Sequence, residues 1–153
     1  MLICGIDPGS TESAYIISDS PFLIREKGIL KNDDVLEVIK KASFDVLVIE
    51  MIASYGMSVG KEIFETCVWI GRFIQAAPIF ANRVYRKDVK LHFCGTARAK
   101  DSNVRQALID RFGEPGTKKN PGPLYGIKKD EWSALAIAVY WQDRARLPDI
   151  KEV

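Results

Sequence analysis

Two short apolar runs in the sequence, residues 2–6 and 44–49, each stop at an acidic residue. The first ends at Asp7 and the second, interrupted only by Asp45, ends at Glu50. Short, mostly apolar runs of this kind are typical of strands that are buried on both faces of a sheet. If two such strands are parallel neighbours, their carboxyl ends meet at one edge, where α/β proteins bind their ligands. The two runs therefore predict an α/β sheet with a pair of carboxylates at its functional edge.

The rest of the pattern predicts a mixed sheet around these two strands. Residues 13–18 and 22–30, with an interruption at Pro21, predict two more strands that form an antiparallel meander with the first. A further strand is expected over 84–93, a mobile loop over the proline- and glycine-rich residues 114–126, and helices from Asn32 or Asp33, over 58–77, from Asp101 or Ser102 to Gly113, and over 128–146. The predicted fold class is α/β: a mixed five-stranded sheet, with three antiparallel strands and then parallel strands, flanked by helices.

The composition limits the class of protein. A chain of 153 residues that is 47% hydrophobic can bury one core, so we expect a single domain over residues 1–153. The three cysteines are scattered and form no CxxC or Cys/His cluster, which argues against a zinc site or disulfides and favours a cytoplasmic protein. No run approaches the roughly 20 apolar residues of a membrane span, and Asp7 interrupts any signal peptide, so no membrane partner is expected.

A third acid, Asp130, stands at the start of the last predicted helix, where the helix dipole favours its ionised form. Asp7 and Glu50 would repel each other at a buried edge unless a cation neutralised them, and oxygen ligands suit Mg²⁺. Asp7, Glu50 and Asp130 together predict a two-metal centre for in-line phosphodiester hydrolysis. A purely structural role is the alternative for two of these acids, because Asp7 before a Pro-Gly pair also fits a simple turn and Asp130 also fits a helix cap. An acid in the position of Glu50 has no such structural purpose.

Four segments, in this order, resemble the RuvC-like Holliday junction resolvases of the RNase H-like superfamily, phage-borne members included. They span nearly the whole chain: residues 3–9 (ICGIDPG), like the opening strand with its metal-binding aspartate; 46–50 (VLVIE), like the central strand with its essential glutamate; 89–99, like the strand and loop before the penultimate helix; and 130–138 (DEWSALAIA), like the final helix. The resemblance implies a metal-dependent, structure-specific endonuclease that resolves four-way or branched DNA junctions. It further implies Mg²⁺ or Mn²⁺ as cofactor and no nucleotide cofactor.

The chain departs from this family at one ligand position. One turn after Asp130, where the family carries a second acid, this sequence has Ser133. A hydroxyl is a poorer Mg²⁺ ligand than a carboxylate, and the neighbouring Glu131 points about 100° away on an ideal helix. Because Ser133 occupies the position of the family's second acid, it is the fourth predicted ligand beside the three acids, and a weaker one. An RNase H-like nuclease acting on flaps or RNA:DNA hybrids, and a branched-DNA-binding protein without catalysis, remain the alternatives.

The net charge of +2 is too small to indicate a nucleic-acid partner, but the cations are unevenly distributed. They gather near the predicted acids, which fits a phosphate backbone, although solvated surfaces are often basic as well. Tyr55 follows the Glu50 strand, where the resembled family has an aromatic residue that wedges into the junction; packing in the core is the alternative. The predicted DNA contacts are Tyr55, Arg86, Lys87, Lys90, Arg98, Lys100, Lys118, Lys119, Lys128 and Lys129. The resemblance also implies a homodimer, and the only histidine, His92, is expected to have a structural role.

Overall fold

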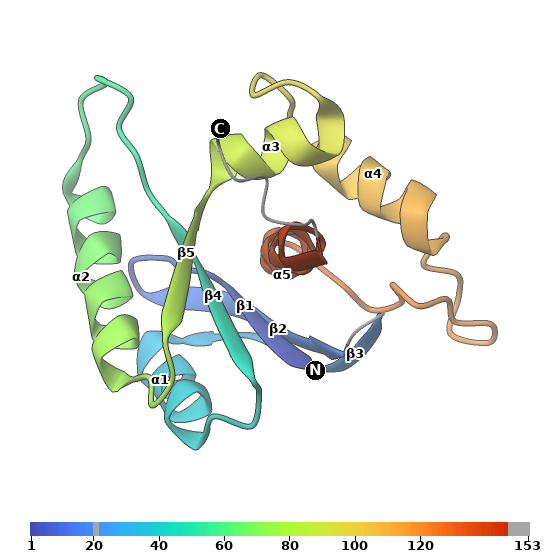
Figure 1. The fold of residues 1–153 in the computed structure, drawn as a ribbon, viewed down its shortest axis with the longest axis horizontal. Coiled ribbons are helices and arrows are strands. Elements are labelled where there is room, and N and C mark those ends of the chain that lie inside the picture. The colour runs from blue at the N-terminus through green and yellow to red at the C-terminus, as the bar shows by residue number, and fades with distance from the viewer. Residues whose placement is uncertain (20–21, 147–153) are drawn as a thin grey trace.

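The computed structural model describes residues 1–19 and 22–146. A five-stranded sheet in the order β3-β2-β1-β4-β5 forms its centre (Figure 1). Strands β1, β2 and β3 pair antiparallel, and β4 runs parallel to both β1 and β5, which confirms the predicted mixed sheet. The interruption predicted at Pro21, and the last seven residues of the predicted domain, lie outside the described residues. The strands are β1 (Leu2–Asp7), β2 (Glu12–Asp19), β3 (Leu23–Lys31), β4 (Val46–Met51) and β5 (Ala81–Tyr85).

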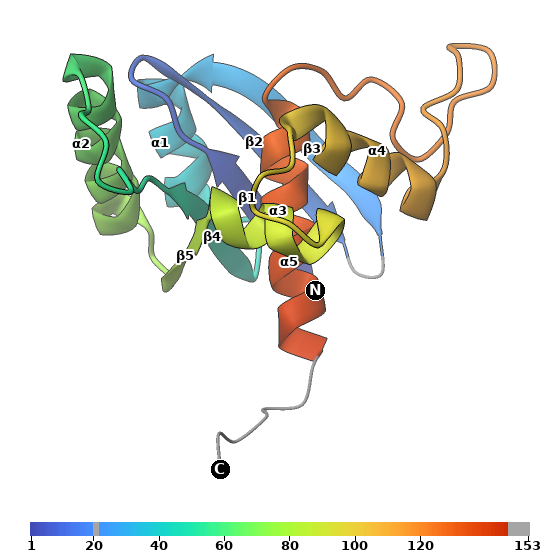
Figure 2. The same cartoon turned by 90° about the horizontal axis from the view of Figure 1, so that it is seen from above.

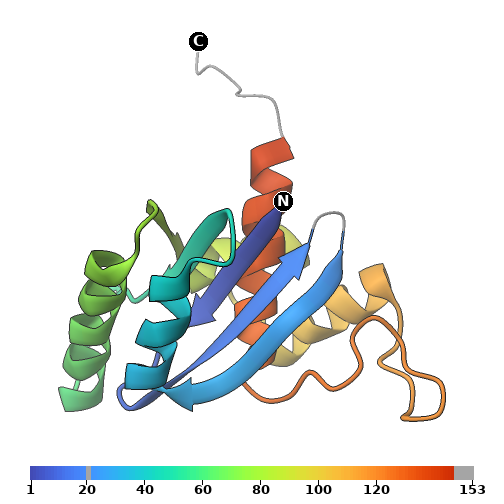
Figure 3. The same cartoon turned by 90° about the horizontal axis from the view of Figure 1, so that it is seen from below.

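Helices cover both faces of the sheet (Figures 1 and 3). On one face lie α1 (Asn32–Lys41) and α2 (Lys61–Ala76), which pack against each other and bury one half of the core. On the other face α5 (Glu131–Arg146) lies directly on β1 and β2, while α3 (Arg86–Cys94) and α4 (Asp101–Phe112) pack beside it. No helix in the described part of the chain is both long and apolar enough to cross a membrane.

The strand predicted over residues 84–93 is wrong. Strand β5 begins earlier, at Ala81, and ends at Tyr85, after which the chain forms helix α3. Alternating basic and apolar residues suggested a strand, but three residues of α3 reach the core. Phe93 follows Val89 by four positions, which is the spacing of one helical turn, and Cys94 stands next to Phe93. His92 and the family-like residues 89–91 therefore lie in a helix.

Gly5 brings α5 unusually close to the central strand. A Cβ atom at Gly5 would collide with the carbonyl oxygen of Ala134 and crowd Ala138, so only glycine fits at this contact. Because side chains alternate along a strand, Asp7 is on the same face as Gly5, and Glu50 on the same face as the buried Val48. The close contact thus places the start of α5 over Asp7 and Glu50, at the carboxyl ends of β1 and β4.

Candidate active site

Asp7 and Glu50 lie side by side at the carboxyl ends of two parallel strands. Strands β1 and β4 are in register up to Ile6 and Ile49, so the next residue of each strand is one of the two acids. Both side chains are largely buried, with 12% of Asp7 and 9% of Glu50 exposed. The juxtaposition expected from the two apolar runs is therefore present in the structure.

A buried hydrogen-bond network fixes the turn that follows Asp7. The backbone N–H of Gly9 donates to Ser13 Oγ (3.1 Å), whose hydroxyl donates in turn to Asn32 Oδ1 (2.6 Å). The Asn32 amide donates back to the carbonyl oxygen of Gly9 (2.9 Å). Ser13 and Asn32 are both almost fully buried, so the network ties the turn to the start of α1 and holds the backbone at Asp7 in place.

The electrostatics of the acid pair are unfavourable without a cation. Burial, the charge of Glu50 and hydrogen bonding to Glu50 raise the pKa of Asp7 to about 9, and the more distant charge of Asp130 acts in the same direction. Arg86 acts in the opposite direction but does not outweigh them. A group with so strongly perturbed a pKa, placed in a cleft, is a typical mark of a functional site.

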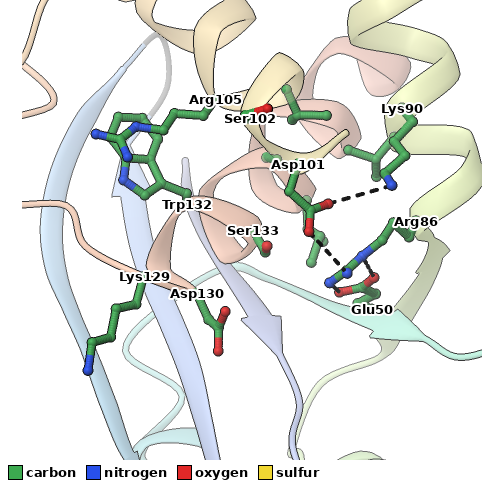
Figure 4. Close-up of a pocket in the computed structure, with 14 residues that line it drawn as sticks. Glu50, Arg86, Lys90, Asp101, Ser102, Arg105, Lys129, Asp130, Trp132 and Ser133 are labelled. Carbon is green, nitrogen blue, oxygen red and sulfur yellow. Dashed lines mark hydrogen bonds and ion pairs between the residues drawn. The ribbon is translucent and has the colours of Figure 1, made fainter. Parts of the chain in front are cut away.

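Arg86 contacts both acids of the pair, and 45% of its side chain is exposed. Its Nε donates to Glu50 Oε1 (2.7 Å) and its Nη2 to Glu50 Oε2 (3.2 Å), as Figure 4 shows. The same Nη2 lies 3.8 Å from Asp7 Oδ1. Burial alone would lower the pKa of Arg86, but the charges of Glu50, Asp7 and Asp101 raise it instead. Arg86 was predicted as a DNA contact, and its ion pairs with these acids are an addition that the sequence did not indicate.

Asp101 is a residue of the site that the sequence reasoning missed. It is the first residue of α4, and its carboxylate lies 3.6 Å from Arg86 Nη1 and 3.6 Å from Lys90 Nζ (Figure 4). The one available signal was that Asp101 stands in an otherwise basic stretch of the chain. Its position links α4 to α3 across the opening of the site.

Two cavities meet at the Glu50–Arg86 pair. One, of about 300 Å³, is lined by Asp130, Ser133 and Lys129 among others, and the second, of about 340 Å³, by Asp7 and Tyr55. Glu50 and Arg86 line both cavities, so their ion pair forms the partition between the two.

Asp130 precedes α5 as its capping residue, since the backbone N–H of Ala134 donates to its carbonyl oxygen (3.1 Å). The predicted helix over 128–146 therefore begins later, at Glu131. The Asp130 carboxylate is exposed and stands apart from Glu50 (Figure 4), and nowhere in the described residues are three or more Asp, Glu, His or Cys side chains close enough to hold a metal ion. Metal binding at this site would thus require side chains to move.

Glu131 is directed away from the site, as the helical geometry predicted. It is almost fully buried and accepts hydrogen bonds from Lys27 Nζ (3.0 Å) and from the backbone N–H of Lys128 (3.0 Å). Glu131 lines neither of the two cavities, whereas Ser133 lines the same cavity as Asp130.

Only part of the predicted DNA-binding set lies at the two cavities. Tyr55 is 62% exposed, which excludes packing in the core, and Lys87 Nζ lies 5.8 Å from the centre of its ring. Lys90 and Lys129 line the same cavity as Asp130. The remaining predicted contacts are exposed residues that line neither cavity: Arg98, Lys100, Lys118, Lys119 and Lys128.

The loop between α4 and α5 carries Lys118 and Lys119 and extends beyond α4, away from the sheet (Figure 2). Residues 114–126 were predicted to form a mobile loop. The segment is a loop, but it contains its own hydrogen bonds, from the backbone N–H of Gly122 to the carbonyl oxygen of Pro115 (2.8 Å) and between Thr117 and Asn120. These bonds close the tip into a small hairpin that presents both lysines to solvent.

Comparison with solved structures shows what the fold is similar to. The structure of Thermus thermophilus RuvC matches with a TM-score of 0.65 at 18% identity, covering 95% of this chain and 96% of that chain. T. thermophilus RuvC in complex with its Holliday junction substrate matches with a TM-score of 0.66 at 16% identity, covering 95% of each chain. The fowlpox virus Holliday junction resolvase matches with a TM-score of 0.51 at 12% identity, over 95% of this chain and 99% of that chain. Neither a protein-family model nor a curated protein matches the sequence. The chain therefore has the RuvC-like form of the RNase H fold.

Proposed function

We propose that this protein, as a single nuclease domain, is a metal-dependent endonuclease that resolves four-way or branched DNA junctions by phosphodiester hydrolysis. The observation that carries the proposal is the pair of buried acids, Asp7 and Glu50, beneath the start of α5 with Asp130 and Ser133. The fold is similar to those of RuvC and of a poxvirus Holliday junction resolvase, and open α/β sheets bind their ligands at the carboxyl ends of the strands.

The residues at the site fit a hard divalent cation. Asp7 and Glu50 place carboxylate oxygens next to each other in a buried position where their charges are poorly neutralised, as the raised pKa of Asp7 indicates. Asp7, Glu50 and Asp130 would hold Mg²⁺ or Mn²⁺, with Ser133 as a weaker fourth ligand. When bound, two such ions supply positive charge to the scissile phosphate and the leaving oxygen in phosphodiester hydrolysis. The protein's part is to hold Asp7 and Glu50 rigidly at the ends of two strands.

The exposed cations and Tyr55 support binding of branched DNA. Lys90 and Lys129 line the cavity beside Asp130, and Lys87 and Tyr55 lie near each other on the Asp7 side, so a phosphate backbone that crosses the acids would meet positive charge on both sides. Tyr55 is free to stack on a base exposed at the junction centre. Tyr55→Ala should therefore weaken binding to a four-way junction more than binding to a duplex, and equal weakening would reject stacking at the junction.

The outward face of α2 supports a homodimer. Phe64, Val68 and Ile74 are exposed on this helix, and Gly71 between them faces open space that another helix can approach closely. A two-fold dimer would place two sites on a junction in which two strands must be cut. Val68→Glu should convert the dimer to a monomer, as measured by light scattering after gel filtration; an unchanged mass would exclude this face as the dimer contact.

The decisive experiment is a cleavage assay on a labelled four-way DNA junction beside duplex, flap and RNA:DNA hybrid controls. Mg²⁺ and Mn²⁺ are titrated separately, and Asp7→Asn is tested in parallel. We expect paired, metal-dependent nicks that are confined to the junction and absent from the variant. Cleavage of the flap or hybrid instead would reassign the substrate. Tight junction binding without cleavage in either metal would identify a binding protein and reject the enzyme.

A further inference from the structure

We propose, on the premise of the metal site proposed above, that Arg86 is a built-in competitor of the divalent metal. Its guanidinium is hydrogen-bonded to both carboxylate oxygens of Glu50 and lies beside Asp7, and it has to leave Glu50 before an ion binds there. Arg86 is thus a positioning residue that offsets the charge of Glu50 in the metal-free protein and sets how tightly the site binds metal.

The contacts of Arg86 are the first support for this proposal. Both oxygens of Glu50 accept hydrogen bonds from the guanidinium, at 2.7 and 3.2 Å, and the Asp7 carboxylate is 3.8 Å from the same Nη2 nitrogen. The oxygens that a metal would need are therefore already engaged by a planar cation that matches a carboxylate in two places. Metal and Arg86 cannot both use Glu50 in this way.

The shape of the site leads to the same conclusion. The Glu50–Arg86 pair separates the cavity that contains Asp130 and Ser133 from the cavity that contains Asp7. While Arg86 is bound to Glu50, the proposed ligands lie on two sides of a partition. This agrees with the lack of any cluster of three ligating side chains among residues 1–19 and 22–146. If Arg86 swings outward, the two cavities join at Glu50, and acids from β1, β4 and the start of α5 face one space.

Arg86 also has a second partner toward which it can move. It is the first residue of α3 and 45% of its side chain is exposed, so its outward path is open to solvent. Its Nη1 already lies 3.6 Å from Asp101, which is an exposed residue on the rim of the site. Asp101, or a DNA phosphate in its place, would therefore receive the guanidinium once it leaves Glu50.

The test measures Mn²⁺ binding to the full-length, DNA-free protein by isothermal titration calorimetry. A charge-assisted bidentate pair corresponds to about 10-fold or more in an equilibrium constant, so Arg86→Gln should lower the Kd for Mn²⁺ by about 10-fold. Arg86→Lys keeps the charge but not the two parallel bonds, so its Kd for Mn²⁺ should lie between those of Arg86→Gln and the wild type. Arg105→Gln is the matched control, because Arg105 lines the same cavity but stacks on Trp132 and should leave the Kd unchanged.

Circular dichroism and thermal melting establish that each variant is folded. Equal or weaker Mn²⁺ binding by folded Arg86→Gln and Arg86→Lys, when the wild type does bind Mn²⁺, would reject Arg86 as a competitor and leave the metal site intact. The same change in Arg105→Gln as in Arg86→Gln would show a general charge effect and would also reject it. Glu50→Gln, which removes a proposed ligand, is titrated as well. If neither the wild type nor any Arg86 variant binds Mn²⁺ more tightly than Glu50→Gln does, the metal site itself is absent, and the proposed function fails with it.

Discussion

Two clusters in which arginine meets a largely buried carboxylate, both within the described part of the chain, are built differently. In the first, Asp143 of α5 receives two hydrogen bonds from Arg111 of α4, at 2.6 and 2.7 Å, and lies 2.7 Å from His92 of α3. We refer to Asp143, Arg111 and His92 as the helix buckle, since the three residues join three helices. The second is the acid pair, Asp7 and Glu50, with Arg86.

The two clusters shift the pKa of an aspartate in opposite directions. Asp143 and Asp7 are similarly covered, with 15% and 12% of their side chains exposed. Burial would raise the pKa of Asp143, but hydrogen bonds from Arg111 and His92 outweigh it and lower the pKa. At Asp7 burial and the charge of Glu50 prevail, and the pKa rises.

The difference lies in the ratio of acids to cations. One carboxylate has two partners in the helix buckle, whereas in the acid pair two carboxylates share one guanidinium. The buckle is therefore complete as it stands and has a structural role. With one guanidinium for two carboxylates, the acid pair cannot easily ionise both acids unless a further cation such as a divalent metal ion binds, which is why the chemistry is proposed there.

The largest contrast is expected in catalysis. Because a bound ion contributes several kcal/mol to the transition state, Glu50→Gln should lower the rate of junction cleavage by about 10³-fold or more. Asp143→Asn should change that rate by less than about 3-fold well below its melting temperature, because the variant sites are separate in the structure. Both rates are measured at saturating Mg²⁺ on the same labelled junction. A comparable loss in both variants would remove the distinction between site and buckle.

The next contrast is in the pH dependence of stability of the metal-free protein. The pKa of Asp7 is raised to about 9, so the folded protein keeps a proton that the unfolded chain releases near pH 4. Between these two pH values, Asp7 therefore destabilises the folded state more and more as the pH rises. Asp7→Asn should therefore stabilise the protein at pH 8, by on the order of 1–3 kcal/mol, and have little effect at pH 4.

The contribution of Asp143 to the stability of the folded protein depends on pH in the opposite direction. Its pKa is lowered, so its stabilising effect is present above the unfolded pKa and is lost as the pH falls through the folded value. Asp143→Asn should destabilise the protein at pH 8, by about 1–3 kcal/mol for the lost charge-assisted bonds, and less so in acid. Urea denaturation from pH 4 to 9 with chelator present measures both variants; destabilisation by Asp7→Asn at pH 8 would contradict the raised pKa.

The acids of the site could be located from the sequence because local patterns determine where they lie. The apolar runs that stop at Asp7 and Glu50 indicate two buried strands, which pair in parallel in the structure, and the helix that follows Asp130 is apolar along much of its length. The antiparallel meander of the first three strands and the extent of α4 along the chain were predictable for the same reason.

The partners of the acids could not be predicted in this way. Arg86 contacts Glu50 only because β5 ends at Tyr85 and α3 begins with Arg86, and the alternating residues 84–93 hid this boundary. Asp101 joins the site through the packing of α3 on α4, which no local pattern encodes. Likewise, the helix buckle depends on side chains from three helices.

A smaller effect is expected where Ser133 replaces the family's acid. Ser133 lines the same cavity as Glu50 and Asp130, so Ser133→Asp adds a charged oxygen ligand to the site and should lower the Kd for Mg²⁺ by about 5- to 10-fold. Without metal, the same substitution adds a third repelling charge and should lower the melting temperature. Ser133→Asn, similar in size but uncharged, serves as the control. An unchanged Kd in Ser133→Asp would place Ser133 outside the metal site.

The smallest effect is expected at His92 of the helix buckle. His92→Gln removes one partner of Asp143 and the edge contacts of the ring with Phe93 and Tyr140, but leaves both bonds from Arg111. The free energy of unfolding should fall by about 0.5–1.5 kcal/mol, and by more in Arg111→Gln, which removes the two charge-assisted bonds. Urea denaturation at pH 7 measures the difference, and Mn²⁺ affinity should be unchanged in both variants. A larger loss in His92→Gln than in Arg111→Gln would show that the histidine, not the arginine, holds the three helices together, and a change in Mn²⁺ affinity would show that the buckle and the acid pair are coupled through α3.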